Sequence, residues 1–207
     1  MTARRCSTAV VALHYQNEVL HPDGKIKVGL SADSPERARV IRAARSLLTQ
    51  ARASQTPIAH VRVAYRPDYA DVNQNAPIFR NVVAIGAVPE GQWGAEFFEE
   101  LAPDPHSPGE FVVKHARINA FYGSQLEEIL KVLDARRLII AGVATHSVVE
   151  STVRHAVDIG FEVTVAADAC AAASPATHEA SLQSMKLIAD IQEVSALGPL
   201  FVQGSSS

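Results

Sequence analysis

Short apolar runs rich in β-branched residues alternate with helical patterns along this chain, and this alternation restricts the fold more than any other feature. The runs predict strands at residues 10–13, 58–63, 111–113, 138–141 and 161–166. Strands that alternate with helices indicate a parallel sheet, joined by right-handed crossovers and covered by helices on both faces. The sequence therefore predicts an α/β fold: a three-layer α/β/α arrangement with a Rossmann-like parallel sheet.

The predicted helices begin with recognisable start signals. Residues 34–36 read Ser-Pro-Glu, which gives an N-cap, a proline at the first helical position and an acidic first turn. Ser124 and Ser147 each precede a glutamate by three residues, which is the spacing of a capping box. Ser174 is followed by a proline and predicts a last helix that reaches about residue 190.

Residues 66–109 interrupt the alternation of strands and helices. The segment contains six prolines, and only 95–101 has a helical pattern. A long insertion after the second strand lies on the side of the sheet where ligands bind. We expect it to form a lid or a contact between subunits. The whole chain, residues 1–207, is predicted to be a single domain with a disordered tail from about residue 203.

The composition argues against several kinds of partner. Apolar residues make up 47% of the chain and charged residues 20%, with a net charge of −3 and no basic run, so we expect neither nucleic acid nor an anionic membrane as a partner. No apolar run approaches the roughly 18 residues that span a bilayer, and the first residues do not resemble a signal peptide. A cytoplasmic location is expected, where Cys6 and Cys170 would remain free thiols.

Polar residues follow the predicted strands at the edge where open α/β sheets bind ligands, beyond the carboxyl ends of the strands. His14 and Gln16 follow the first strand, Lys114 ends the third, and the glycine turn 142–146 follows the fourth. That turn also opens a helix, whose free N–H groups favour a developing anion. We expect His14, Lys114 and the turn to converge on one cleft. Asp168, after the fifth strand, is interpreted as a structural hydrogen-bond acceptor.

Three separated blocks carry a family resemblance, and they read VVALHYQNEVL, FVVKHARINAFYGSQLEEIL and IIAGVATHSVVESTVRHAVDIGFEVTVAADAC. In this order they resemble the isochorismatase-like hydrolases, the superfamily that also contains nicotinamidases and N-carbamoylsarcosine amidohydrolases. The resemblance runs from about residue 9 to residue 190. It implies a six-stranded parallel sheet, a catalytic aspartate, lysine and cysteine, and assembly as a homodimer or homotetramer.

The resemblance places two altered residues in the catalytic set. The lysine is kept as Lys114, but the aspartate position holds His14 and the cysteine position holds Val148. The resemblance also implies a cis peptide between Val143 and Ala144, and an oxyanion hole formed by backbone N–H groups near Ala144 and Val148. Valine cannot form a thioester, so amide hydrolysis through an acyl-enzyme is not expected.

A non-covalent reaction stays open. The isochorismatases proper also lack the cysteine, and they cleave a vinyl ether with the aspartate as the acid. The turn of this chain that holds His146 is similar to the corresponding turn of those enzymes. Two roles stay open for each residue. A neutral His14 beside Lys114 suits a base, and the alternative is a histidine that only bonds the glycine turn; Lys114 either faces the cleft or extends into solvent. Ser147 is interpreted as an N-cap rather than a nucleophile, because adjacent helical positions point about 100° apart.

Further candidates for substrate contact are less specific, since each could equally be a packing residue: Gln16, Arg66, Trp93, Phe121 and Tyr122. Arg66 has the planar guanidinium that suits a carboxylate. Neither metal-ligand spacing nor a glycine fingerprint at the first turn is present, so no metal and no cofactor are expected.

Two functions remain open. The protein is either a hydrolase of a small anionic metabolite without covalent catalysis, or an inactive homologue that binds a ligand or serves as an assembly subunit.

Overall fold

The computed structural model describes residues 7–26, 28, 30 and 34–201. Within them, parallel strands form a six-stranded sheet in the order β3-β2-β1-β4-β5-β6. The strands are β1 (Thr8–Leu13), β2 (Ile58–Val63), β3 (Glu110–His115), β4 (Arg137–Gly142), β5 (Glu162–Ala166) and β6 (Asp190–Gln192). This confirms the predicted fold class and the five strands that the apolar runs indicated. The short β6 has no apolar run, so only the family resemblance pointed to it.

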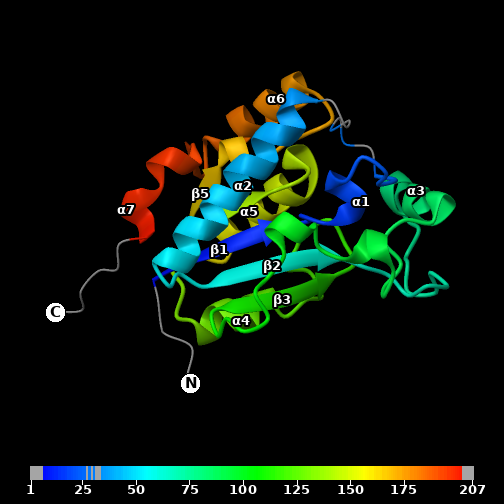
Figure 1. Cartoon of the computed structure of the whole chain (residues 1–207), viewed down its shortest axis with the longest axis horizontal. Helices are drawn as coiled ribbons and strands as arrows, with labels where there is room; N and C mark the ends of the chain where they lie inside the picture. Colours follow the sequence, from blue (N-terminus) through cyan, green and yellow to red (C-terminus); the bar gives the residue numbers. More distant parts are fainter. Residues whose placement is uncertain (1–6, 27, 29, 31–33, 202–207) are drawn as a thin grey trace.

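Seven helices accompany the sheet in the described part of the chain, and α3 and α7 lie at opposite ends of the molecule (Figure 1). They are α1 (Asn17–Leu20), α2 (Pro35–Ala53), α3 (Pro77–Ile85), α4 (Leu126–Val132), α5 (Glu150–Asp158), α6 (Pro175–Met185) and α7 (Gly198–Phe201). None of these helices combines the length and the apolar character needed to cross a bilayer.

The core lies on both sides of the central strand. All six residues of β1 are buried, because β2 and β4 flank this strand with their own apolar residues. The long helix α2 turns one buried face toward the sheet, with Val40, Ala44 and Leu48 on it. The strand order places the carboxyl ends of β1, β2 and β4 side by side, where the site forms.

The insertion differs from the prediction. Residues 95–101 are not a helix, because the backbone of residues 96–98 pairs with the loop after β1 instead, through Asn17 N to Glu96 O and Phe98 N to Tyr15 O at 2.9 Å each. Only short 3₁₀ turns, Trp93–Ala95 and Glu99–Leu101, flank this contact. The unpredicted helix α3 begins with Pro77, which a first helical position tolerates, and ends at Gly86 in a left-handed conformation.

The last predicted helix is shorter than expected. Ser174 is its N-cap and accepts a hydrogen bond from the backbone N–H of Thr177, but α6 ends at Met185, and β6 begins where the helix was expected to stop. The residues from Asp190 onward form the sixth strand, which pairs with β5, so the helix ends before them. The predicted tail from about residue 203 and Cys6 lie outside the described residues.

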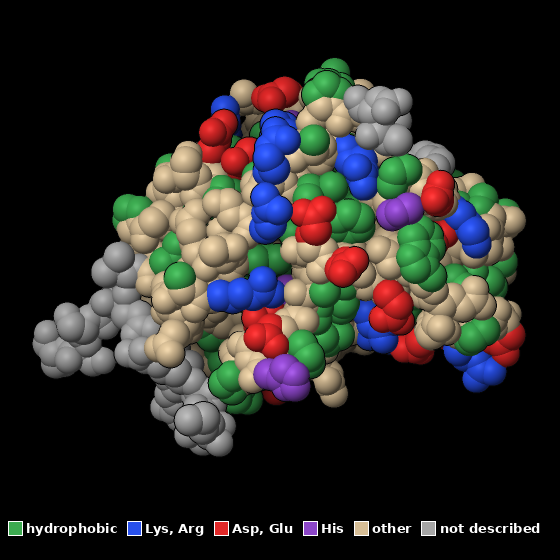
Figure 2. All heavy atoms as spheres, viewed as in Figure 1, with side chains coloured by type: hydrophobic (Ala, Val, Ile, Leu, Met, Phe, Trp, Pro, Cys, Tyr) green, Lys and Arg blue, Asp and Glu red, His purple; other side chains and the backbone are tan. Residues whose placement is uncertain are grey.

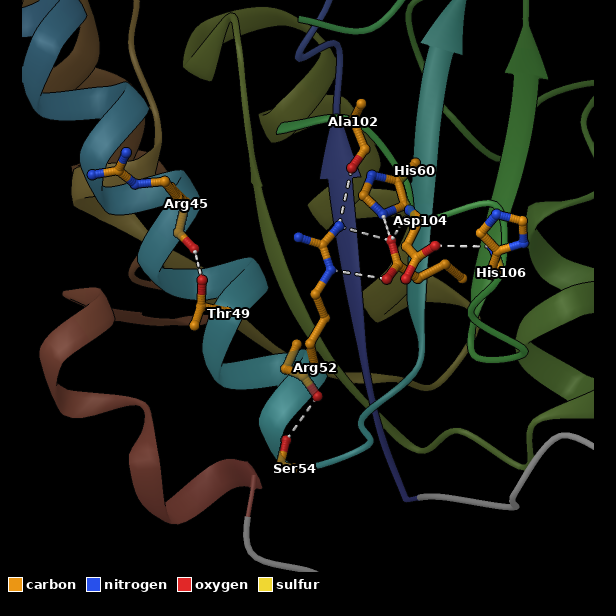
Figure 3. A network of polar contacts seen from close by, with 10 residues as sticks. Arg45, Thr49, Arg52, Ser54, His60, Ala102, Asp104 and His106 are labelled. Atoms are coloured by element: carbon orange, nitrogen blue, oxygen red, sulfur yellow. Dashed lines mark hydrogen bonds and ion pairs between the residues drawn. The ribbon is translucent and has the colours of Figure 1, made fainter. Parts of the chain in front are cut away.

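A buried carboxylate fixes the edge strand β3 to the rest of the fold. Glu110 accepts two hydrogen bonds of 2.9 Å from Arg52 and lies 2.8 Å from Nε2 of His60 and 3.0 Å from the backbone N of Asp104. Figure 3 shows Arg52 reaching toward His60 and Asp104 from the end of α2. Although burial raises the pKa of Glu110, the hydrogen bonds from Arg52 and His60 bring it well below its usual range. Glu110 is therefore held as an anion.

Removing this charge should destabilise the protein. Glu110→Gln leaves Arg52 and the buried His60 facing a neutral group, and breaking a buried ion pair costs about 3 kcal/mol, less where one partner is partly exposed. We expect the free energy of unfolding in urea at pH 7 to fall by about 2 kcal/mol. Glu100→Gln, which removes the exposed pair with Arg45, is the control and should cost less than about 1 kcal/mol. Equal losses in both variants would contradict this role for Glu110.

Candidate functional site

A cavity of about 240 Å³ lies beyond the carboxyl ends of β1, β2 and β4. The loop after β1, the end of β2, helix α3, the segment after β3 and the turn after β4 all contribute to its wall. Six of the residues that line it were singled out from the sequence: His14, Val143, Ala144, His146, Ser147 and Val148. The turn after β4 therefore forms part of the cavity wall, as expected because open α/β sheets bind ligands beyond the carboxyl ends of their strands.

A pair of histidines stands at one side of this cavity. The Nε2 atoms of His14 and His115 are 2.5 Å apart, and His115 is only 2% exposed. Burial lowers the pKa of His14 well below 6.5, and the neighbouring His115 lowers it further. Burial likewise lowers the pKa of His115 to about 4. Both imidazoles are therefore neutral near pH 7, and the His14 side chain bonds His115 rather than the Gly142 turn.

Lys114 does not face the cavity, so the expected meeting of His14 and Lys114 is wrong. Its ammonium group forms an ion pair of 2.5 Å with Glu90 at the surface, and Glu90 also pairs with Arg62. Successive side chains of a strand point to opposite faces, so a shift of one position in β3 exchanges the buried side chain for the exposed one. His115 takes the place beside His14 that the resemblance had assigned to Lys114.

The turn after β4 begins with a cis peptide bond that the resemblance implied. The peptide bond between Val143 and Ala144 is cis. A π-helical turn, Thr145–Val149, follows it and leads directly into α5. Val148 is buried and presents an apolar side chain to the cavity. The position of the family's cysteine thus lies in the first turn of this helical segment.

Ser147 is not the N-cap that the sequence predicted. The helical segment begins at Thr145, and the backbone N–H of Ser147 already bonds to Ala144 O at 3.2 Å, so Ser147 lies within the first turn. The expected capping partner Glu150 instead accepts hydrogen bonds from Ser181 and Arg154. The π-helical turn starts the helix three residues earlier than the capping pattern indicates.

Five predicted substrate contacts lie outside the cavity wall: Gln16, Arg66, Trp93, Phe121 and Tyr122. Gln16 is buried, and its amide bonds Val63 and Ala95, which holds the insertion against β2. Arg66 pairs with Asp68 at the surface. Trp93 contacts His21 edge-to-face, Phe121 stacks on His155, and Tyr122 faces solvent. Each of these five side chains therefore packs or lies at the surface. This was the alternative to substrate contact that the sequence left open.

Two further residues have structural positions. Asp168 accepts a hydrogen bond of 2.9 Å from the backbone N of Val194, in agreement with its interpretation as a structural acceptor. Cys170 is buried outside the cavity wall, and burial raises the pKa of its thiol to about 12. It therefore has little thiolate character. In the described residues, no group of three or more His, Cys, Asp or Glu side chains is placed to hold a metal ion.

Arg117 was missed by the sequence reasoning. It lies two residues beyond β3, and its guanidinium carbon is 3.8 Å from the centre of the Phe79 ring of α3. It also bonds Asn73 O at 3.1 Å and Asn75 Oδ1 at 2.9 Å. Among the described residues that line the cavity, Arg117 is the only one with a permanent charge. Its position just after a strand could have marked Arg117 as a candidate, but helix α3, which carries its partner Phe79, was not predicted.

Known proteins resemble this one in architecture and in sequence. Residues 8–196 match the family model for the isochorismatase domain. The chain is 28% identical over 181 residues to the ureidoacrylate amidohydrolase RutB of Caulobacter segnis, covering 82% of this chain and 74% of that protein. It is also 28% identical over 194 residues to a probable inactive nicotinamidase of Arabidopsis thaliana, covering 91% and 92% of the two chains.

A solved structure agrees in fold. The cysteine hydrolase from Pseudomonas syringae pv. phaseolicola superposes with a TM-score of 0.82 at 23% sequence identity, covering 94% of this chain and 92% of that one. Since the family model spans nearly all of the described residues, the chain belongs to the isochorismatase-like hydrolases.

Proposed function

We propose that this protein hydrolyses a small anionic metabolite without a covalent enzyme intermediate, with His14 as the base that activates water. The observation that supports this most is that a neutral imidazole lines the same cavity as Val148, the position of the family's missing cysteine. A neutral imidazole can accept a proton from water near pH 7. No cysteine among the described residues lines the cavity.

In the proposed reaction, the oxygen of a water molecule adds to the electrophilic carbon of the substrate. The proton of that water passes to His14, which later returns it to the leaving group. The substrate oxygen that gains negative charge is stabilised by N–H groups of the turn after β4, where the helical segment begins at Thr145. Ala144 and Val148 line the cavity at this turn.

The charge of the cavity wall supports an anionic substrate. Arg117 supplies a permanent positive charge, and no aspartate or glutamate is among the described lining residues. A guanidinium binds a carboxylate through parallel hydrogen bonds, and two of its donors are already used on Asn73 and Asn75. The remaining donors would hold the carboxylate of the substrate. The cavity volume of about 240 Å³ suits a metabolite rather than a peptide.

A second candidate function is ligand binding without turnover. The similarity to a probable inactive nicotinamidase favours it, because that relative matches almost the full length of this chain. In this alternative the cavity keeps its shape and Arg117 keeps its role, while the catalytic groups are lost. The two functions differ only in whether a bound molecule is converted.

A substrate screen separates them. Vinyl ethers, amides and ureides that carry a carboxylate are compared with their methyl esters by following hydrolysis and, in parallel, binding. We expect turnover only with the carboxylates, and Arg117→Gln should lower kcat/KM by roughly 10- to 100-fold, because a charge-assisted hydrogen bond contributes about 1.5–3 kcal/mol. Arg66→Gln, at a surface arginine outside the cavity, should leave kcat/KM unchanged. Binding without turnover would instead support the inactive homologue.

A further inference from the structure

The half-buried His14 and the buried His115 form an unusual contact. Their Nε2 atoms are 2.5 Å apart, and the ring centres are separated by 4.8 Å. A hydrogen bond between two neutral imidazoles needs one ring to donate and the other to accept, because each neutral ring has a single N–H. The contact alone does not decide which ring donates. A third atom decides it.

The carbonyl oxygen of Asn119 lies 3.3 Å from Nδ1 of His115. A carbonyl oxygen can only accept, so Nδ1 of His115 must carry the hydrogen. The Nε2 atom of a neutral His115 then has the lone pair and accepts from His14. Consequently, His14 carries its hydrogen on Nε2 and its lone pair on Nδ1.

His14 alone of the pair lines the cavity. Its Nε2 is directed at His115, so Nδ1 is the nitrogen left for a molecule in the cavity, and no hydrogen bond among the described residues uses it. The backbone of His14 is fixed as well, because it is left-handed, with φ of 57°, and its N–H bonds Val61 O at 2.9 Å. Of the described lining residues that carry a charge or titrate, Arg117, His146 and Tyr65 are the others.

We propose that Nδ1 of His14 is the proton acceptor of the site, and that His115 is a positioning residue that selects this tautomer through its own bond to Asn119 O. This inference rests on the proposed function for the role of His14 as a base, but the tautomers themselves do not depend on turnover. His115 contacts no substrate. Its function is to keep the lone pair of His14 on the nitrogen that faces the reacting water.

Nitrogen-15 NMR of histidine-labelled protein tests the tautomers directly. Two-bond proton–nitrogen correlations at pH 7 should show His14 protonated on Nε2 and His115 protonated on Nδ1, with each ring assigned from its own substitution to glutamine. His115→Phe should give His14 as a mixture of both tautomers. His106→Phe, which removes an exposed histidine, should leave the His14 signals unchanged.

The kinetic readout is separate. With a substrate found in the screen, His115→Phe should lower kcat by at least about 10-fold while KM stays the same, because the base is misaligned rather than the substrate released. His14 protonated on Nδ1, or His115 protonated on Nε2, would overturn the inference even if turnover is observed. The expected tautomers in a protein without turnover would uphold the inference about His115 as the tautomer selector and refute the proposed hydrolase. The tautomers are read in the unsubstituted protein, and the glutamine variants serve only to assign its signals, so this part of the test stands even if His115→Phe does not fold.

Discussion

The triple variant His14→Asp, His115→Lys and Val148→Cys is expected to hydrolyse amides or ureides through a thiol. The family resemblance assigns an aspartate, a lysine and a cysteine to its catalytic set, and the structure places positions 14 and 115 together beside the cavity that position 148 lines. A cysteine in the first turn of a helical segment has a lowered thiol pKa, because the helix N-terminus favours the thiolate.

A catalytic nucleophile contributes as much as roughly 10⁶-fold to the rate, so even an imperfect site should raise hydrolysis at least about 100-fold above the parent protein. Two signatures should accompany the gain: inactivation by iodoacetamide and an acyl adduct in the intact mass during turnover. Circular dichroism and urea unfolding establish that the variant is folded, since it buries new charged groups.

The matched control is the double variant His14→Asp and Val148→Cys. It retains the natural Lys114, so it would be complete if that lysine belonged to the site. We expect it to stay near the activity of the parent, because Lys114 is paired with Glu90 on the other face of β3. Adding Lys114→Gln to the triple variant should not remove the gain. A double variant as active as the triple would show that the assignment of His115 is wrong.

The fold could be predicted from the sequence because its determinants are local. Buried parallel strands are apolar along their whole length, as β1 is, and α2 shows both its start signal at Ser34 and its buried face. The segment 95–101 was misjudged for the opposite reason. Its conformation depends on backbone bonds to the loop after β1, which lies about eighty residues earlier in the sequence and has no local signature.

The site was predicted in part, and the errors have a common physical origin. His14 follows from where a strand ends and Val148 from the family resemblance, and both line the cavity. The choice between Lys114 and His115 depends on strand register, where one position reverses the side of the sheet. Arg117 depends on its packing against Phe79, a tertiary contact with a helix that was not predicted. Local patterns therefore locate the site but do not decide which neighbouring side chain enters it.

Substitution of His14, the proposed base, is expected to have the second large effect. His14→Ala should lower kcat/KM by roughly 10²- to 10⁴-fold, the usual contribution of a general base, and His14→Gln should do the same while filling the space. Lys114→Ala is the control and should keep the parent's kcat/KM, because its side chain lies outside the cavity wall. Loss of activity in Lys114→Ala with retention in His14→Gln would reverse these roles.

The central claim is that a neutral imidazole, and neither a thiolate nor an ammonium group, carries the chemistry of this cavity. The pH dependence of kcat/KM between pH 4.5 and 9 tests it most directly. A base works only when unprotonated, and burial together with His115 lowers the pKa of His14 well below 6.5. We expect a constant kcat/KM from pH 6.5 to 9 and a fall only at lower pH. A rate governed by a group that titrates above pH 7, unchanged in His14→Gln, would contradict it.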